Sequence, residues 1–183
     1  MDQKTTEESR PWLAVGAEIA GLLPLIDPTE FDAVRRELED RTRRWFFSGQ
    51  GRSGLSAKMA AMRVMHMGRE SHVLGEVTCP SVRSGDGIVF VSGSGETPVT
   101  VAFARIARSE GACVVAVTGA RDSSLAQIAD HTITIPVQTS AQLGGNLFEV
   151  TAVLMLDSLV NELGARDHED PAGTLRYWHT NMQ

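Results

Sequence analysis

Six residues from Ser92 to Thr97 combine hydroxyl side chains with glycines directly before a helical pattern. Ser92, Ser94 and Thr97 supply hydroxyl donors, while Gly93 and Gly95 let the backbone approach a ligand closely. A helix N-terminus adds unpaired N–H groups and a partial positive charge, which suit a phosphate. A plain glycine-rich turn would not explain three hydroxyls and two glycines together. The segment therefore predicts a phosphate-binding loop.

No lysine follows this loop, so it differs from the nucleotide P-loop, which ends in Gly-Lys-Ser/Thr. A second glycine-rich segment, Gly49–Gly54, also follows an apolar strand. Its glycine spacing fits the dinucleotide fingerprint, but no convincing acidic ribose ligand follows, since Glu76 is poorly placed. Arg52 and Ser53 instead offer a cation and a hydroxyl near the same rim. An exposed loop arginine is the alternative interpretation of Arg52.

Strands and helices that alternate along the chain must position these two loops. Helices are expected at 12–23, 28–38, 55–67, 97–109, 124–129, 146–163 and 171–178, and strands at 45–48, 72–74, 87–92, 112–118 and 132–136. Such alternation favours an α/β fold with a parallel sheet, helices on both faces and right-handed crossovers. Ligands in these folds bind beyond the carboxyl ends of the strands, which both glycine-rich loops leave.

The composition narrows the class of protein. A chain of 183 residues predicts a single domain, with N-terminal helices in 1–44, an α/β core in 45–164 and a C-terminal helix and tail in 165–183. The net charge is −6, and the arginines at 35–36 and 41–44 lie among acids, which argues against a nucleic-acid partner. The surface of a solvated or subunit-facing helix is the preferred interpretation of those arginines.

The same composition bears on location and metal binding. We expect no membrane partner, because no apolar run approaches the roughly 20 residues of a membrane span. The polar start at Met1–Lys4 is unlike a signal peptide, so we expect a cytoplasmic protein. Cys79 and Cys113 are then expected to be free thiols. Neither the cysteines nor the scattered histidines have the spacing of a zinc site, so we predict no metal.

The phosphate loop resembles the hallmark of the SIS (sugar isomerase) domain family. That hallmark is an aspartate, an apolar strand and Ser-x-Ser-Gly-x-Thr, matched here by Asp86, Ser92, Ser94, Gly95 and Thr97. Within the family the chain most resembles the 6-phospho-3-hexuloisomerases over about residues 10–183. The further matching segments are Gly51–Gly54, Ala57-Lys58, Met62–Gly68, Gly75–Pro80, Leu147–Glu149 and the ending Trp178–Gln183.

The resemblance implies a three-layer α-β-α sandwich with a five-stranded parallel, flavodoxin-like sheet. It also implies a homotetramer with sites between subunits and an enediol reaction without cofactor that interconverts D-arabino-3-hexulose 6-phosphate and fructose 6-phosphate in the ribulose monophosphate pathway. The residues that would bind the phosphate are Ser53, Ser92, Ser94 and Thr97. Glu149 matches the family's proton-shuttling glutamate, and His179 matches a histidine delivered from a neighbouring chain.

Elementary chemistry agrees with these roles without requiring them. Moving a carbonyl between adjacent carbons needs one base on one face of the sugar, and a carboxylate at Glu149 would be favoured near a helix N-terminus. Glu149 is otherwise a capping partner, and His179 an ordinary surface histidine. Arg52 would stabilise the developing enediolate oxygen, because a fixed cation near forming charge lowers the barrier.

Some positions depart from the family pattern. Residues 142–146 read Gln-Leu-Gly-Gly-Asn where Pro-Met-Gly-Thr is typical, Gln50 replaces a small residue, and the chain ends in Met182-Gln183 instead of Leu-Glu. Segment 138–145 is rich in small polar residues and is expected to be a mobile loop over the site. Two alternatives stay open: an isomerase of another phosphosugar, and a non-catalytic sugar-phosphate-binding module.

Overall fold

The structure, a computed structural model, describes residues 10–182. Met1–Lys4 and Gln183, which entered the predictions above, lie outside the described residues. The elements run in the order α1 (Pro11–Leu22), η1 (Leu23–Leu25), α2 (Pro28–Glu39), β1 (Trp45–Gly49), α3 (Gly51–His66), β2 (Ser71–Val73), β3 (Gly87–Ser92), α4 (Pro98–Ser109), β4 (Cys113–Thr118), α5 (Ser124–Ile128), β5 (His131–Thr134), η2 (Leu143–Gly145), α6 (Asn146–Asp167) and α7 (Pro171–Trp178).

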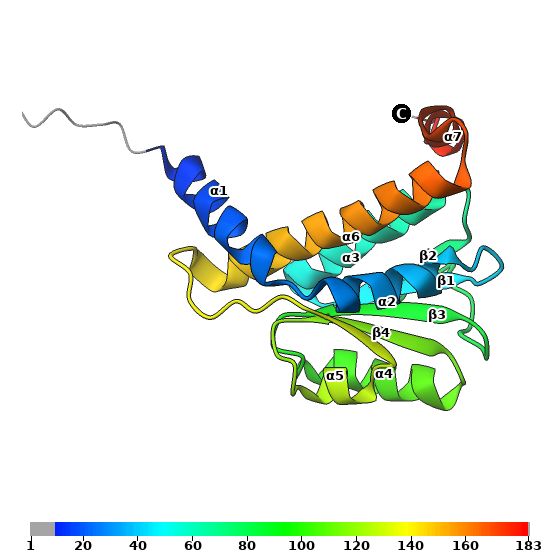
Figure 1. The fold of residues 1–183 in the computed structure, drawn as a ribbon. Coiled ribbons are helices and arrows are strands. Elements are labelled where there is room, and N and C mark those ends of the chain that lie inside the picture. Colours follow the sequence, from blue (N-terminus) through cyan, green and yellow to red (C-terminus); the bar gives the residue numbers. More distant parts are fainter. Residues whose placement is uncertain (1–9, 183) are drawn as a thin grey trace, which may run out of the picture.

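The strands form one parallel sheet in the order β2-β1-β3-β4-β5. Helices α4 and α5 cover one face, while α2, α3 and α6 lie over the other, with α1 beyond them (Figure 1). The predicted three-layer α/β sandwich with a five-stranded parallel sheet is therefore confirmed. All strand pairs are joined by crossovers, as a parallel sheet requires.

Two apolar clusters flank the sheet, and the central strand β3 contributes to both. Ile88 and Phe90 pack in the cluster beneath α4 and α5, whereas Val89 and Val91 pack in the larger cluster beneath the other helices. All four side chains are fully buried. Burying such a side chain stabilises the fold by roughly 1.5–3 kcal/mol. The apolar run at 87–92 thus fixes the strand that leads into the phosphate loop.

Helix α3 begins four residues earlier than the sequence predicted. Residues 51–54 were expected in a turn, but they form its first turn. A Cβ on Gly49 would lie 2.8 Å from the carbonyl carbon of Ser53, and one on Gly54 would lie 2.7 Å from the carbonyl oxygen of Gly49. These glycines therefore allow a tight backbone contact between the end of β1 and the start of α3.

By length and composition alone, helix α6 is long and apolar enough to cross a membrane, since its most apolar 18-residue window within Leu143–Asp167 has a mean hydropathy of 1.4. In the fold it is a core helix. Leu156, Leu159, Val160 and Leu163 are all buried in the larger cluster. A helix that packs on both a sheet and a neighbouring helix is apolar over much of its circumference. Its contacts with the core account for part of this composition, because 39% of that window is buried.

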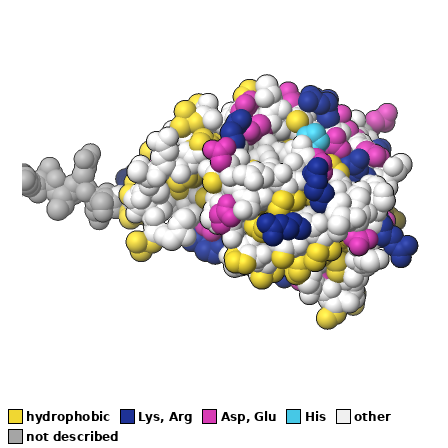
Figure 2. Space-filling view, turned by 90° about the horizontal axis from the view of Figure 1, so that it is seen from below, with side chains coloured by type: hydrophobic (Ala, Val, Ile, Leu, Met, Phe, Trp, Pro, Cys, Tyr) yellow, Lys and Arg dark blue, Asp and Glu magenta, His cyan; other side chains and the backbone are white. Residues whose placement is uncertain are grey.

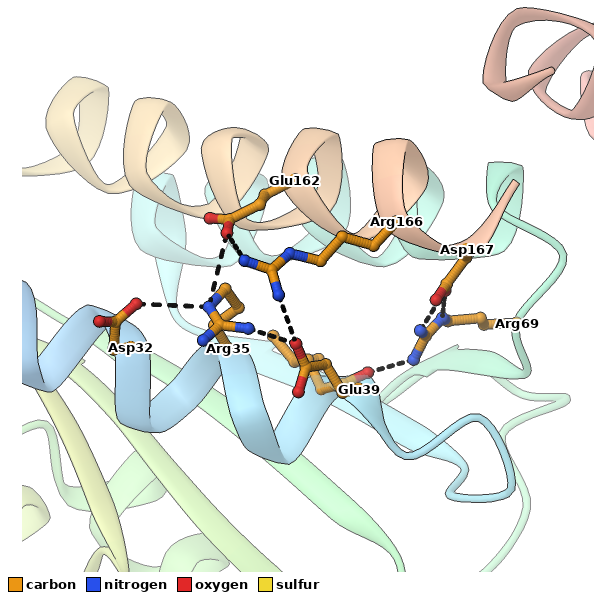
Figure 3. A network of polar contacts seen from close by, with 8 residues as sticks. Asp32, Arg35, Glu39, Arg69, Glu162, Arg166 and Asp167 are labelled. Carbon is orange, nitrogen blue, oxygen red and sulfur yellow. Dashed lines mark hydrogen bonds and ion pairs between the residues drawn. The ribbon is translucent and has the colours of Figure 1, made fainter. Parts of the chain in front are cut away.

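A polar network joins α2 to α6 and to the segment before β2 (Figure 3). Arg35 contacts Glu39 and lies 3.6 Å from Glu162, which in turn pairs with Arg166 at 2.7 Å. Arg69, nearly buried, bonds Asp167 and the carbonyl of Leu38. These contacts show that Arg35, one of the two consecutive arginines on α2, helps to hold α2 against α6.

Figure 2 shows the face that carries α4 and α5. Basic, acidic and hydrophobic side chains are interspersed there, without a stripe of one charge on this face. Helix α4 exposes Val99, Phe103 and Ile106. A nucleic-acid surface needs clustered cations, so this face does not resemble one.

Candidate active site

The two glycine-rich segments meet where the strand order reverses, between β1 and β3. In open α/β sheets, the crevice outside the carboxyl ends of the strands at such a point is the usual ligand site. Gly49 ends β1 and Ser92 ends β3, and the two residues lie on neighbouring paired strands. The topology thus places both segments at one edge of the sheet, as the sequence predicted.

The loop from Ser92 to Thr97 is held in shape by its own hydroxyls. Ser92 is buried, accepts a hydrogen bond from the Gly95 amide at 3.2 Å, and its Oγ lies 3.0 Å from Thr97 Oγ1. Gly95 has a φ of +65°, and a Cβ there would lie 2.1 Å from Ser123 Oγ. No larger residue fits this position. Thr97 occupies the N-cap position of α4, but its hydroxyl bonds Ser92 instead of the helix backbone.

A cavity of about 460 Å³ opens beside this loop. Its lining includes Ser94 and Thr97 from the loop, and Phe148 and Glu149 from the start of α6. Gly93, Gly119, Ala120, Val137 and Gly145 complete the lining. Ser94 is exposed and accepts a hydrogen bond from the Glu96 amide at 3.2 Å. Two hydroxyl residues at the start of α4 and an acidic residue at the start of α6 therefore line one cavity.

Glu149 lies in the first turn of α6 with its side chain 17% exposed. Its Oε2 is buried without a hydrogen-bond partner and lies 3.4 Å from Nη2 of Arg52. Helix α6 has Gly145 at its N-cap, with a φ of +79°, and no side chain caps it. The capping interpretation of Glu149 is therefore not what the geometry shows. A buried carboxylate oxygen without a hydrogen bond is costly, which marks this position for another purpose.

A chain of polar contacts connects α1 to Arg52. The Glu18 carboxylate accepts hydrogen bonds at 2.8 Å from Ser140, from the Ala141 amide and from Gln142 Nε2. Gln142 in turn accepts from Asn146. Three residues of the loop 138–145 are thus hydrogen-bonded to Glu18 of α1. These hydrogen bonds lower the pKa of Glu18 from its ordinary value, the Ala141 amide contributing most.

Asn146 completes this chain, because its side-chain oxygen accepts a hydrogen bond from Arg52. The arginine that lies beside Glu149 is therefore positioned by residues 142–146, the segment that departs from the family pattern. Sequence reasoning noticed that departure but did not assign these residues a role. Glu18 was missed altogether, because it is 124 residues from Gln142 and gives no local signal.

The structure separates the other predicted site residues. Ser53, in the first turn of α3, is nearly buried, and neither it nor Arg52 is among the residues that line the cavity. Arg52, with its side chain 48% exposed, reaches the site only through Glu149 and Asn146. Ser53 and Arg52 are thus neighbours of the cavity rather than part of its wall.

His179 lies at the other end of the molecule. Its ring stacks on His66, with ring centroids 5.0 Å apart, at the end of α3. Arg52 and His66 are 14 residues apart on α3, which places them about 21 Å apart along the helix axis. Figure 1 shows α7 beside the far ends of α3 and α6, away from loop 138–145. Within one chain, His179 therefore cannot reach Glu149.

Comparisons with known proteins identify the class. A model of the SIS domain matches residues 38–160. That match spans well over half of the chain, so the chain belongs to the SIS domain family. The resemblance seen in the phosphate loop is confirmed.

Particular relatives narrow the comparison. The chain is 35% identical to the 3-hexulose-6-phosphate isomerase of Mycobacterium gastri over 175 residues, 91% of this chain and 86% of that protein. It is 36% identical to the enzyme of the same name from Bacillus subtilis (strain 168) over 147 residues, 75% and 79% of the two chains. A crystal structure of a hypothetical protein from Methanococcus jannaschii, for which that function is inferred, has a TM-score of 0.84 at 28% identity, covering 96% of this chain and 100% of the other.

Proposed function

We propose that this chain is a 6-phospho-3-hexuloisomerase, also called 3-hexulose-6-phosphate isomerase, which interconverts D-arabino-3-hexulose 6-phosphate and fructose 6-phosphate. The curated relatives of that name support the reaction. The observation in the structure that carries the proposal is Glu149. Its carboxylate has an oxygen that makes no hydrogen bond, and Glu149 lines the same cavity as Ser94 and Thr97.

The cavity suits a phosphosugar because its two sides offer different chemistry. On one side, Ser94, Thr97 and the amides at the start of α4 bind the phosphate, which anchors the sugar. On the other side, the Glu149 carboxylate meets the carbon chain. A phosphate held without a metal needs several hydroxyl and amide donors, and the loop provides them. Ser92 acts by holding Thr97 in place.

The proton transfers follow from this placement. Glu149 removes the C3 proton of fructose 6-phosphate, and the electron pair forms a C2–C3 enediolate as the C2 carbonyl oxygen takes up negative charge. Arg52, 3.4 Å from Glu149, stabilises that oxygen. The proton of the C3 hydroxyl passes to the C2 oxygen, which becomes a hydroxyl, and the protonated Glu149 returns its proton to C2 as the C3 carbonyl forms. Atoms and charge balance without a redox partner.

We further propose that the chain works as a single SIS domain in a cytoplasmic homotetramer, with His179 supplied by a neighbouring subunit. The distance from His179 to the site of its own chain supports an intersubunit role. An apolar groove between α3 and α6, lined by Met59, Met62 and Leu154, is a suitable contact surface. Removal of residues 178–183 should then reduce turnover far more than stability, and equal losses of both would favour a packing role.

The experiment that tests the reaction is solvent deuterium exchange into fructose 6-phosphate by the wild-type chain and by Glu149→Gln. Deuterium at C3, together with formation of the 3-hexulose, is the expected result. In the variant, both should fall by about 10²–10⁴-fold, the usual contribution of a general base. Glu96→Gln is the matched control, because Glu96 lies in the same loop but does not line the cavity, and its carboxylate accepts a hydrogen bond from the Ser124 amide.

Each other outcome has a definite meaning. Deuterium at C1 alone would indicate an aldose–ketose isomerase of another phosphosugar. Binding of phosphosugars without any exchange would support a sensor module and overturn the proposal. A Glu149→Gln variant with normal turnover would leave the reaction in place and remove Glu149 as its base.

A further inference from the structure

Glu37, Cys113 and His131 form a cluster at the amino-terminal edge of the sheet. They come from α2, from the first residue of β4 and from the first residue of β5. One donor atom from each lies within 4.8 Å of the others. The candidate active site is at the opposite ends of the strands, so it does not account for this cluster.

The spacing of the three donors fits a tetrahedral metal ion. His131 Nε2 lies 3.2 Å from Glu37 Oε1, and Cys113 Sγ lies 3.7 Å from Glu37 Oε2. Zinc bonds of about 2.0–2.3 Å at tetrahedral angles place neighbouring donors roughly 3.3–3.6 Å apart. Thiolate, imidazole and carboxylate are also the ligand types that zinc uses. The cluster thus has the chemistry of a three-residue zinc site, and its donors, all within 4.8 Å of one another, need to close by at most about 1.5 Å to reach these spacings.

Access to the cluster is open. All three residues are partly exposed. A cavity of about 390 Å³ adjoins Cys113 and is also lined by Arg43, Asp86 and Asp130. This space can supply water as a fourth ligand. Burial, followed by the charge of Glu37, raises the pKa of the Cys113 thiol to about 11, so a metal ion must displace a proton to bind the sulfur.

Arg43 is the present cationic partner of Glu37, with Nη1 2.6 Å from Oε2. Its Nε is buried without a hydrogen-bond partner, and its guanidinium lies 5.7 Å from the centroid of the Trp45 ring. Arg43 therefore has a second contact that it keeps if Glu37 turns to a metal ion. It should compete with the metal for the Glu37 carboxylate. Removal of Arg43 should therefore strengthen metal binding, whereas removal of a ligand should weaken it.

We propose that Glu37, Cys113 and His131 bind a divalent cation of the zinc class, which ties α2 to β4 and β5. This site is independent of the proposed isomerase reaction. Cys113 supplies a thiolate, His131 an imidazole nitrogen and Glu37 a carboxylate oxygen, with water in the remaining position. Such a cation joins a helix to the edge of the sheet and stabilises the folded chain, because it binds the folded state.

The test is titration of the chelator-treated full chain with Co²⁺ and with Zn²⁺. With Co²⁺, the expected result is a thiolate-to-metal charge-transfer absorption. With Zn²⁺, we expect a rise in the unfolding temperature. Cys113→Ser should abolish the absorption, whereas Cys79→Ser, which changes the other free cysteine, should keep it. His131→Gln should weaken Co²⁺ binding by about 100-fold or more, since even outer partners of a metal ligand contribute about 10–100-fold. Arg43→Gln should tighten binding.

Either arm can overturn the proposal. A wild-type chain without the charge-transfer absorption, or a Cys113→Ser variant that retains it, rules out this site. If Cys113→Ser fails to fold, His131→Gln decides, because unchanged Co²⁺ affinity in that variant is equally incompatible with the proposal. A Zn²⁺-induced rise in unfolding temperature that survives in both variants would place the metal elsewhere.

Discussion

Asp86 and Glu149 are both largely buried carboxylates, but they occupy opposite ends of the sheet and have opposite surroundings. Asp86, before β3, accepts hydrogen bonds from Arg44 Nε at 2.9 Å and Nη2 at 2.7 Å, and from the Arg83 amide at 2.7 Å. Glu149, beyond the carboxyl ends of the strands, has a buried oxygen without any hydrogen bond.

This difference indicates that one of the two carboxylates stabilises the fold and the other contacts the substrate. A saturated carboxylate such as Asp86 stabilises the fold, because its charge is compensated by several donors. Glu149 has an ion pair with Arg52 at 3.4 Å but an oxygen without a hydrogen bond, so its carboxylate is available to a substrate. Asp86 belongs to the hallmark that identifies the family, yet it joins β1 to β3 and lies far from the cavity.

The largest expected effect is a loss of stability in Asp86→Asn, and its absence would break this comparison. Removal of the charge leaves Arg44 without its partner and should lower the free energy of unfolding by about 3 kcal/mol, as for hydrogen bonds to a charged group. Urea denaturation measures it. Asp32→Asn, on the exposed surface of α2, is the matched control and should change stability by less than about 0.5 kcal/mol. If Asp86→Asn were as stable as that control, Asp86 would not be structural.

A smaller effect is expected at the phosphate side of the cavity. Ser94→Ala removes one hydroxyl donor and should raise KM for fructose 6-phosphate about tenfold with kcat nearly unchanged, because a hydrogen bond to a charged group contributes about 1.5 kcal/mol. Ser109→Ala removes a hydroxyl that bonds only its own helix and should have no kinetic effect. An unchanged KM in Ser94→Ala would remove this hydroxyl from the phosphate site.

The features that could be predicted from the sequence are those formed by residues close together in the chain. The phosphate loop was predictable because its hydroxyls, glycines and helix start lie within six residues, and β3 because it is an unbroken apolar run. The start of α3 was missed because Gly51 and Gly54 favour a turn locally, whereas in the structure the Gly54 amide bonds the Gln50 carbonyl and the missing Cβ atoms of Gly49 and Gly54 let the first helical turn pack against the end of β1. Spacing could not predict the cluster of Glu37, Cys113 and His131, because its donors come from three separate elements.

Gln142→Ala tests the contacts that position Arg52. The change removes the link between Glu18 and Asn146, so Arg52 should be less well held beside Glu149. We expect kcat to fall about fivefold, corresponding to roughly 1 kcal/mol for one hydrogen bond, while KM changes little. Gln127→Ala, which removes an exposed amide that donates to Asp122, is the control. Equal kinetics in the two variants would show that the chain of contacts does not reach the reaction.

The smallest effect concerns His66, an unsatisfied group at the amino-terminal end of the sheet. Burial, the nearby His179 and Arg63 lower the pKa of His66 from its ordinary value near 6.5, and its Nδ1 is buried without a partner. The folded state thus favours the neutral ring more than the unfolded state does. This contribution to stability is fully present above about pH 6.5 and is lost as the pH falls through the lowered pKa of the folded state.

Urea denaturation at about pH 7.5 and about pH 5.5 measures this loss. His66→Gln should reduce the difference between the two pH values, because the glutamine does not titrate. His72→Gln, which changes a partly exposed histidine beside Glu70, should leave the His66 contribution intact. If His66→Gln kept the wild-type pH dependence, the buried, unpaired Nδ1 of His66 would not reduce the free energy of unfolding at low pH. An unpartnered buried group would then be weaker evidence at Glu149 as well.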